Sequence, residues 1–196
     1  MMEINGREVH GRYLSRWAYS DIRPIHPIQL VRDPNYVGAV IPLMAHETDS
    51  GYDVFAMADA TVEVFKPLIV PSGWLLGWLD PDYEIQIRPR SSMPMKMRCT
   101  VANTPATVDS GYRGPIGIEI LYFGEWQVDS TLDEAGNKKF QMTILKPYLE
   151  IKKGEKIGQF VNSMVYRPGI VVVDKVTPSD RGAGGFGSTS NFAQQG

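Results

Sequence analysis

The stretch Ile116-Gly117-Ile118-Glu119-Ile120-Leu121-Tyr122-Phe123 places an isoleucine at every second position of its first five residues. Successive side chains of a β-strand point to opposite faces, so this period of two predicts a strand with one buried face. Further short apolar segments rich in strand-favouring residues lie at 62–65, 83–87, 156–165 and 170–173. Many short strands without a long helical period predict an all-β jelly-roll fold, a β-barrel or sandwich, with one short helix across 93–98.

Three parts of the chain depart from this plan. Residues 1–38 are poorly periodic and are expected to be an N-terminal extension. Residues 125–147 hold a polar turn between two apolar stretches, which predicts an inserted hairpin. Residues 178–196 are rich in Gly and Ser and predict a flexible C-terminal lid. We therefore expect one β domain over residues 1–177, followed by the lid.

Composition argues against several classes of function. With 20 basic and 22 acidic residues the net charge is -2, so no basic surface for duplex nucleic acid is expected. No apolar run approaches the roughly 18 residues of a membrane span, and the polar N-terminus does not resemble a signal peptide. The three histidines lack metal-ligand spacing, and the single cysteine, Cys99, cannot form an internal disulfide. These features predict a cytoplasmic protein.

The C-terminal segment Arg181-Gly182-Ala183-Gly184-Gly185-Phe186-Gly187-Ser188-Thr189-Ser190 carries more chemistry than a linker requires. Its glycines allow backbone N–H groups to approach an anion, and Ser188 and Thr189 add hydroxyl donors. Arg181 provides a planar fork for phosphate oxygens, and Phe186 provides a face on which a base can stack. These residues predict a lid that closes over a nucleoside phosphate, although composition alone favours a flexible linker.

Together with this segment, four others resemble the five signature motifs of trimeric dUTPases, in the same order. The first four motifs correspond to Gly51-Tyr52-Asp53-Val54, Arg88-Pro89-Arg90-Ser91-Ser92-Met93, Asn103-Thr104-Pro105-Ala106-Thr107-Val108-Asp109-Ser110-Gly111-Tyr112-Arg113-Gly114, and Gly154-Glu155-Lys156-Ile157-Gly158-Gln159. The sequence departs from the usual pattern at three positions: Ala106 and Ser190 replace glycines, and Lys156 replaces an arginine. Each motif alone has an ordinary explanation as a turn, cap or strand, and only the ordered set indicates the family.

The resemblance implies an enzyme that hydrolyses dUTP to dUMP and pyrophosphate by Mg²⁺-assisted attack of water on the α-phosphorus. Asp109 would be the general base, while Arg90 and Gln159 would act on the phosphates and the attacking water. Asp53 would hold Mg²⁺ through water, since this ion keeps several of its waters. Lys156 is expected to be structural.

The same resemblance implies how the substrate is recognised. Tyr112 would pack on the deoxyribose and exclude a 2′-hydroxyl, and Asn103 would meet the uracil edge. A hairpin through Thr107, Val108 and Gly117 would bind uracil through its main chain. The phosphates would contact Ser91, Ser92 and the tail residues Arg181, Gly187, Ser188 and Thr189, while Phe186 would stack on the base. The family also implies a homotrimer with active sites at subunit interfaces.

Two other functions stay open. Glu119 occupies the position where the related dCTP deaminases place a catalytic glutamate, which leaves deamination or a bifunctional enzyme as an alternative. Met95 stands where a deaminase has an arginine, and the tail also favours dUTPase. The other alternative is a regulatory role in which the hairpin at 125–147, with Trp126 and Phe140, binds a protein partner.

Overall fold

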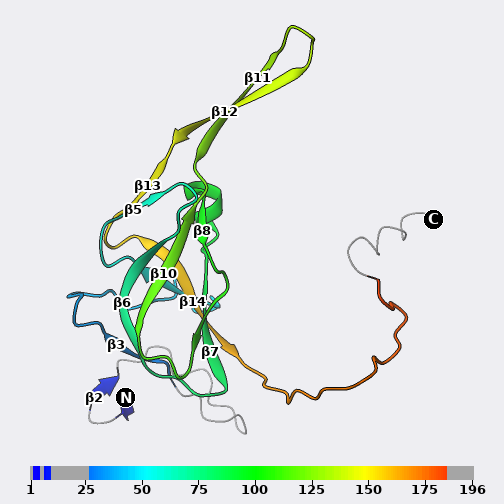
Figure 1. Ribbon diagram of the computed structural model, residues 1–196. Coiled ribbons are helices and arrows are strands. Elements are labelled where there is room, and N and C mark those ends of the chain that lie inside the picture. The colour runs from blue at the N-terminus through cyan, green and yellow to red at the C-terminus, as the bar shows by residue number, and fades with distance from the viewer. Residues whose placement is uncertain (1, 5–6, 10–26, 185–196) are drawn as a thin grey trace. The chain divides into compact units, whose positions relative to one another are not determined.

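The structure, a computed structural model, describes residues 2–4, 7–9 and 27–184. Two four-stranded antiparallel sheets form its body (Figure 1). The first sheet has the order β3 (Gln29–Arg32), β6 (Leu68–Trp78), β10 (Pro115–Tyr122) and β8 (Cys99–Val101). The second has the order β4 (Tyr52–Phe55), β14 (Lys156–Met164), β7 (Tyr83–Arg88) and β9 (Ala106–Asp109). The predicted all-β architecture is confirmed.

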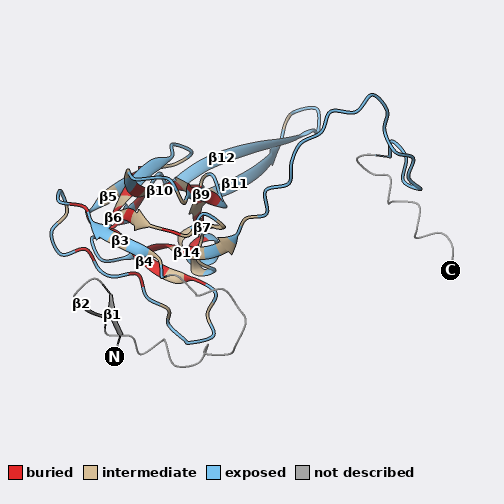
Figure 2. Ribbon diagram, turned by 90° about the horizontal axis from the view of Figure 1, so that it is seen from below, coloured by how far each residue is buried: buried red, intermediate tan, exposed pale blue. Residues whose placement is uncertain are grey.

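Three two-stranded sheets complete the described strands. Strands β1 (Met2–Ile4) and β2 (Arg7–Val9) pair near the N-terminus, and β5 (Ala60–Glu63) pairs with β13 (Tyr148–Ile151). Residues 125–147 contain an antiparallel hairpin of β11 (Glu125–Leu132) and β12 (Lys138–Lys146). Buried residues gather where the two large sheets meet, whereas β11 and β12 are exposed along most of their length (Figure 2).

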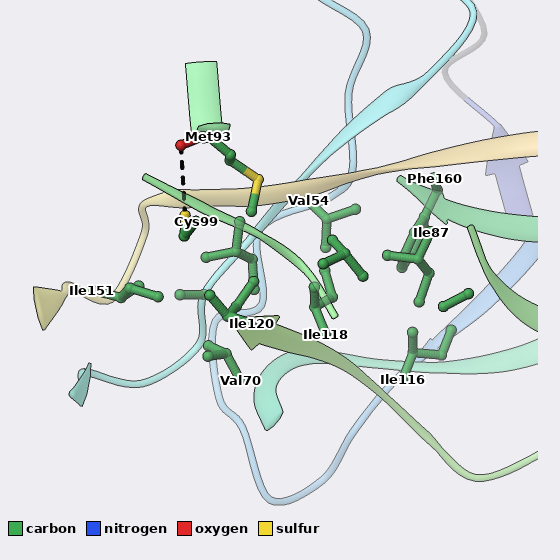
Figure 3. Packing of buried hydrophobic residues seen from close by; sticks show 14 of the residues in the cluster. Val54, Val70, Ile87, Met93, Cys99, Ile116, Ile118, Ile120, Ile151 and Phe160 are labelled. Atoms are coloured by element: carbon green, nitrogen blue, oxygen red, sulfur yellow. Dashed lines mark hydrogen bonds between the residues drawn. The ribbon is translucent and has the colours of Figure 1, made fainter. Parts of the chain in front are cut away.

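The isoleucines of β10 form the centre of the core, as the alternation predicts. Ile116, Ile118 and Ile120 are at most 2% exposed and lie among side chains of the second sheet, such as Ile87 and Phe160 (Figure 3). Burial of a side chain of this size contributes roughly 1.5–3 kcal/mol relative to exposure to water. The core therefore fixes which face of each sheet points outward.

The predicted short helix is a single π-helical turn, η1 (Met93–Met97). Met93 points into the core and anchors this turn (Figure 3). The turn ends at Arg98, whose left-handed backbone (φ 53°) allows its N–H to donate to the carbonyl of Met93. Cys99 follows in β8 with a buried thiol, and burial raises its pKa to about 11. The sulfur is therefore a packing group, and the buried Met93 holds the start of η1 against the core.

Strand β6 is the longest of the described strands, yet its sequence contains Pro71 and Gly73, which usually interrupt strands. The pairing with β10 shifts register at this point, so the strand tolerates a local irregularity. The buried hydroxyl of Ser72 donates to the carbonyl of Ile116 at 2.5 Å and accepts from the N–H of Trp74 at 3.3 Å. At this irregularity the Ser72 side chain thus makes hydrogen bonds with backbone groups that regular strand pairing would satisfy.

The expected strand at Ile170–Val173 is wrong. These four residues are 70–94% exposed and belong to no strand. The chain divides after Val165, earlier than the expected boundary at 177, and Tyr166–Gly196 forms a second unit. An apolar β-prone segment needs a neighbouring strand for its hydrogen bonds, and this unit contains none among its described residues. No helix within the described ranges is long and apolar enough to cross a membrane.

Candidate functional site

The outer face of the second sheet gathers residues from four of the motifs. Val54, Ile87 and Phe160 point into the core, so the residues next to them point outward. Asp53 of β4 is the direct cross-strand partner of Gln159 on β14, which in turn is opposite Arg88 on β7. The other end of this face carries Thr107 and Asp109 of β9, opposite Gln86 and Glu84 of β7.

Asp53 is the centre of a charged cluster. It is 3% exposed, and each carboxylate oxygen contacts a cation. Oδ1 accepts from Arg90 Nε at 2.8 Å and from Gln159 Nε2 at 3.3 Å, whereas Oδ2 accepts from Lys156 Nζ at 2.8 Å. We call these four residues the Asp53 cluster. Two cations around one carboxylate leave a net positive charge, which suits an anion such as phosphate.

The surroundings keep Asp53 ionised. Burial raises the pKa of its carboxyl, but the hydrogen bond from Lys156, the charge of Arg90 and the hydrogen bond from Gln159 outweigh burial and lower it. A depressed folded-state pKa stabilises the fold fully above the unfolded value of about 4. This contribution is lost only as the pH falls through the lower folded-state pKa, so the cluster is intact at neutral pH.

Sequence reasoning missed the role of Lys156 because regular alternation does not predict it. Ile157 and Gly158 both lie on the core side, and the pairing of β14 with β4 shifts register between Lys156 and Gly158. This irregularity turns Lys156 to the same face as Gln159, although they lie three positions apart and regular alternation would place them on opposite faces. The sequence feature that could have indicated the bulge is Gly158, because a glycine inside a strand permits such an irregularity.

Arg90 lies on the connection between β7 and η1. Its carbonyl accepts from the N–H of Met93 at 3.0 Å, so the buried Met93 anchors it. The guanidinium reaches Asp53 through Nε, and Nη1 lies 3.4 Å from the hydroxyl of Ser92. Ser91 is exposed beside it. The predicted phosphate-binding segment is thus joined directly to the Asp53 cluster.

Asp109 and Tyr112 are held by the corner between β9 and β10. The N–H of Tyr112 donates to the carbonyl of Asp109 at 2.9 Å, and its hydroxyl donates to the carbonyl of Pro115 at 3.0 Å. The ring lies over Gly114, where a Cβ would collide with it. Gly114 therefore supports Tyr112, a role the sequence did not indicate. Asp109 and Tyr112 are both exposed.

In the expected hairpin through Thr107, Val108 and Gly117, strands β9 and β10 do not pair with each other. Strand β9 pairs with β7 and strand β10 with β6 and β8, so the two belong to different sheets. Thr107 is exposed and Val108 is buried, as alternation requires. At Gly117 a Cβ would collide with the side chain of Ile69, which itself is 66% exposed. The lack of a side chain at 117 thus accommodates Ile69 in this structure.

Within one chain, Asp109 is separated from the Asp53 cluster. Asp109 is opposite Glu84 on β7, whereas Gln159 is opposite Arg88, four residues further along the strand. At about 3.3 Å per residue this offset is about 13 Å along the strand. The structure brings Asp53, Arg90, Lys156 and Gln159 together but does not bring Asp109 to them.

The remaining predicted residues lie elsewhere. Asn103 is exposed in the turn after β8, which includes the cis peptide Thr104–Pro105. Arg181 is exposed in the second unit, where its Nε donates to the carbonyl of Gly184 at 2.9 Å. The other predicted tail residues, Phe186, Gly187, Ser188 and Thr189, lie outside the described residues. Glu119 is half-buried on the outer face of the first sheet, with no ion pair recorded among the described residues.

Asp53 is the described carboxylate of this cluster that could meet a hydrated metal ion. No group of three or more His, Cys, Asp or Glu side chains that could hold a metal occurs in the described part of the chain. A carboxylate has about four acceptor positions, and Asp53 already accepts three hydrogen bonds. One further acceptor position fits a single water of a hydrated Mg²⁺, which usually takes its direct ligands from phosphates and water.

These features define an all-β protein with a cationic cluster on the outer face of one sheet. Comparison with known proteins specifies this class. A family model described as dUTPase matches residues 38–134. A deoxyuridine 5'-triphosphate nucleotidohydrolase of Gloeothece citriformis is 36% identical over 77% of this chain and 89% of its own length; one of Clostridium tetani is 37% identical with the same coverage. The chain belongs to the dUTPase family.

Solved structures agree on the fold. A dUTPase of Staphylococcus bacteriophage 80alpha, solved with dUPNHPP, matches with a TM-score of 0.67 and 24% identity. The match covers 84% of this chain and 99% of that chain. The dUTPase from phage phi11 of S. aureus, described with a species-specific insert, matches with a TM-score of 0.61 and 20% identity, over 77% and 98% of the two chains. These likenesses support the jelly-roll fold.

Proposed function

We propose that this chain hydrolyses dUTP to dUMP and pyrophosphate. The observation that carries the proposal is the Asp53 cluster, which joins residues of three family motifs into a cationic site. Curated relatives at 36–37% identity are named deoxyuridine 5'-triphosphate nucleotidohydrolases, and the related phage enzyme was solved with dUPNHPP. The charge and the family point to the same class of substrate, a nucleoside triphosphate.

The proposed reaction is an in-line attack of water on the α-phosphorus. The Asp109 carboxylate takes the proton of the water, and pyrophosphate leaves from the opposite side. Arg90 stabilises the charge that develops on the phosphate oxygens, and Gln159 orients the water or the α-phosphate. Arg181 and the following tail close the site and exclude bulk water. No covalent intermediate is required.

Mg²⁺ bound to the phosphate chain would neutralise charge on the triphosphate and assist departure of pyrophosphate. In this chain, Asp53 is the carboxylate positioned to accept a hydrogen bond from one metal-bound water. Ser91 and Ser92 supply hydroxyl donors to the phosphates beside it.

The separation of Asp109 from the Asp53 cluster supports sites composed of residues from two subunits, as in the homotrimer that we propose. An attacking water must lie within hydrogen-bond distance of its base and about 3–3.5 Å from phosphorus. An offset of about 13 Å along one sheet does not allow this for groups of a single chain. In a closed ring of three subunits, one subunit can offer Asp109 to the Asp53 cluster of the next.

The nucleoside would be recognised by the corner that carries Asp109. Main-chain groups of Thr107, Val108 and Gly117 read the uracil, and Asn103 contacts its edge. In the proposed complex, Ile69 moves away from Gly117 to admit the base. The ring of Tyr112 packs against the sugar.

Tyr112→Ala should reduce the preference for dUTP over UTP. The tyrosine ring leaves no space for a 2′-hydroxyl, so its removal should raise kcat/KM for UTP while kcat/KM for dUTP falls. Tyr112→Phe is the matched control, because it removes only the hydroxyl that donates to Pro115. An unchanged ratio in Tyr112→Ala would show that the ring does not select the sugar.

The substrate itself is tested by pyrophosphate release from dUTP, dCTP, dTTP and UTP. The proposal expects release from dUTP only, and no ammonia from dCTP. Glu119→Gln should leave dUTP hydrolysis near the wild-type rate, since no step of the proposed hydrolysis uses its carboxylate. Ammonia from dCTP that disappears in Glu119→Gln would instead establish a deaminase or a bifunctional enzyme.

The hairpin supports a second candidate function, the binding of a protein partner. Its cross-strand pairs Trp126–Ile144 and Val128–Met142, with Phe140, form an apolar face, and the reverse face is polar. Val128, Phe140 and Met142 are 57–68% exposed, whereas Trp126 stacks on Phe65 at 5.7 Å and anchors the base.

The two faces of the hairpin define the chemistry of this partner. Lys138 pairs with Leu132 on the apolar face, whereas Asp129 and Lys139 lie on the reverse face. We infer an amphipathic protein segment whose apolar side covers Val128, Phe140 and Met142 and whose acidic residue meets Lys138.

The partner is sought by affinity capture and then titrated as a purified protein. Its binding should weaken at least tenfold when Val128 and Met142 become serine, a loss of about 1.4 kcal/mol. Thr131→Ser on the polar face is the control, and all variants should retain dUTP hydrolysis. A purified candidate that binds both forms equally would exclude this face.

A further inference from the structure

The ion pair between Arg90 and Asp53 uses a single hydrogen bond. Arg90 Nε donates to Asp53 Oδ1 at 2.8 Å. A guanidinium and a carboxylate usually pair through two parallel hydrogen bonds, one to each oxygen. Here the second oxygen, Oδ2, is occupied by Lys156 Nζ at 2.8 Å. The lysine thus takes the position that the second arm of Arg90 would fill in a two-point pair.

This arrangement leaves the outer nitrogens of Arg90 available. Nη1 makes only a long contact of 3.4 Å with the hydroxyl of Ser92, and no contact of Nη2 is recorded among the described residues. The Arg90 side chain is 27% exposed, compared with 5% for Asp53. The buried carboxylate therefore holds the inner part of the guanidinium, while the outer part can meet a ligand.

We propose that Lys156 is a positioning residue that acts through Asp53 on Arg90. By occupying Oδ2 it restricts Arg90 to one contact, and this keeps the outer nitrogens of Arg90 directed to the phosphate chain. The inference rests on the proposed function, in which Arg90 contacts phosphate. Lys156 itself need not touch the substrate.

The physical reason lies in competition for one carboxylate. Without a donor on Oδ2, a half-buried guanidinium gains a second hydrogen bond by turning toward Asp53. The turn withdraws a donor from the phosphate, and the substrate loses a charge-assisted contact. An arginine at 156 would also occupy Oδ2, so Lys156→Arg should preserve the arrangement, whereas Lys156→Met should release it.

The experiment measures kcat and KM for dUTP in Lys156→Met, Lys156→Arg, Arg90→Gln and the double variant Lys156→Met/Arg90→Gln. We expect kcat/KM to fall about tenfold or more in Lys156→Met and to stay within about threefold of wild type in Lys156→Arg. In the Arg90→Gln background, Lys156→Met should change kcat/KM by less than about twofold, because the group through which it acts is gone.

Lys152→Met is the matched control. It removes a lysine–aspartate pair at the same turn, Lys152 Nζ to Asp59 at 3.2 Å, but on the exposed surface. Its kinetics should equal those of the wild type. Thermal unfolding of every variant separates a loss of folded protein from a loss of positioning.

Three results would overturn the inference. Wild-type kinetics in Lys156→Met would show that Oδ2 needs no occupant. If Lys156→Met lowered kcat/KM by the same factor in the wild-type and Arg90→Gln backgrounds, the lysine would attract phosphate directly. Loss of activity in Lys156→Arg would show that a donor on Asp53 Oδ2 is not sufficient to keep Arg90 directed to the phosphates. If Arg90→Gln alone has no effect, the proposed phosphate role of Arg90 fails first and the inference with it.

Discussion

Asp109→Asn is expected to abolish turnover of dUTP while leaving binding of dUPNHPP largely intact. The substitution keeps the shape of the side chain but removes the basic oxygen that takes the proton from water. General bases typically contribute about 10²–10⁴-fold to rates, so kcat should fall by at least two orders of magnitude. Steady-state pyrophosphate release gives kcat, and calorimetry with the analogue gives the affinity.

Glu84→Gln is the control for this prediction. Glu84 lies directly opposite Asp109 on β7 and is the nearest alternative carboxylate on that face. The kcat of Glu84→Gln should stay near the wild-type value, since Oε1 of Glu84 already accepts a hydrogen bond from Gln86 at 2.7 Å. An Asp109→Asn protein that retains more than about a tenth of the wild-type kcat, a loss below ~1.4 kcal/mol, would exclude Asp109 as the base.

Arg90→Gln is expected to lower kcat/KM by about 10²–10³-fold, the range found when one donor to a developing anion is removed. The glutamine cannot supply the positive charge that the phosphate chain meets. The fold should lose less stability than the roughly 3–5 kcal/mol of a broken, fully buried pair, because Lys156 and Gln159 still neutralise Asp53.

Arg88→Gln separates the role of Arg90 from a general loss of positive charge. Arg88 lies two residues away and is exposed, and its Nε donates to Gln86 at 3.1 Å. It should keep nearly normal kinetics with dUTP. Equal losses in the two variants would mean that the face attracts phosphate by its overall charge, without a specific contact from Arg90.

The sequence predicted the fold where local pattern and tertiary packing agree. The isoleucines of β10 alternate, and all three lie in the core. Strand β6 was not predicted because Pro71 and Gly73 interrupt its pattern. In the structure, the buried hydroxyl of Ser72 makes hydrogen bonds with the backbone of Ile116 and Trp74 at this irregularity. Ile170–Val173 shows the opposite error: its composition favours a strand, but no described neighbouring strand satisfies its backbone within one chain.

The candidate site was predicted as a set of residues but not as an arrangement. The motifs named Asp53, Arg90 and Gln159 separately, and only the strand register shows that they meet. Lys156 was expected to be structural because a lysine keeps the charge of the usual arginine but loses its two-point geometry. That it joins the Asp53 cluster depends on a bulge in β14, which alternation does not predict. The distance between Asp109 and this cluster could not be predicted either, since it depends on the register of β9 on β7.

We propose that each active site combines Asp109 of one subunit with the Asp53 cluster of another. Co-expression of Asp109→Asn and Arg90→Gln chains in equal amounts, followed by assay of the mixed assembly, tests it directly. Random mixing makes about three in four trimers mixed, each with one intact site of three. About a quarter of the wild-type pyrophosphate release per subunit is therefore expected. Activity no higher than that of the two single variants, in trimers shown by differential tags to be mixed, would contradict it.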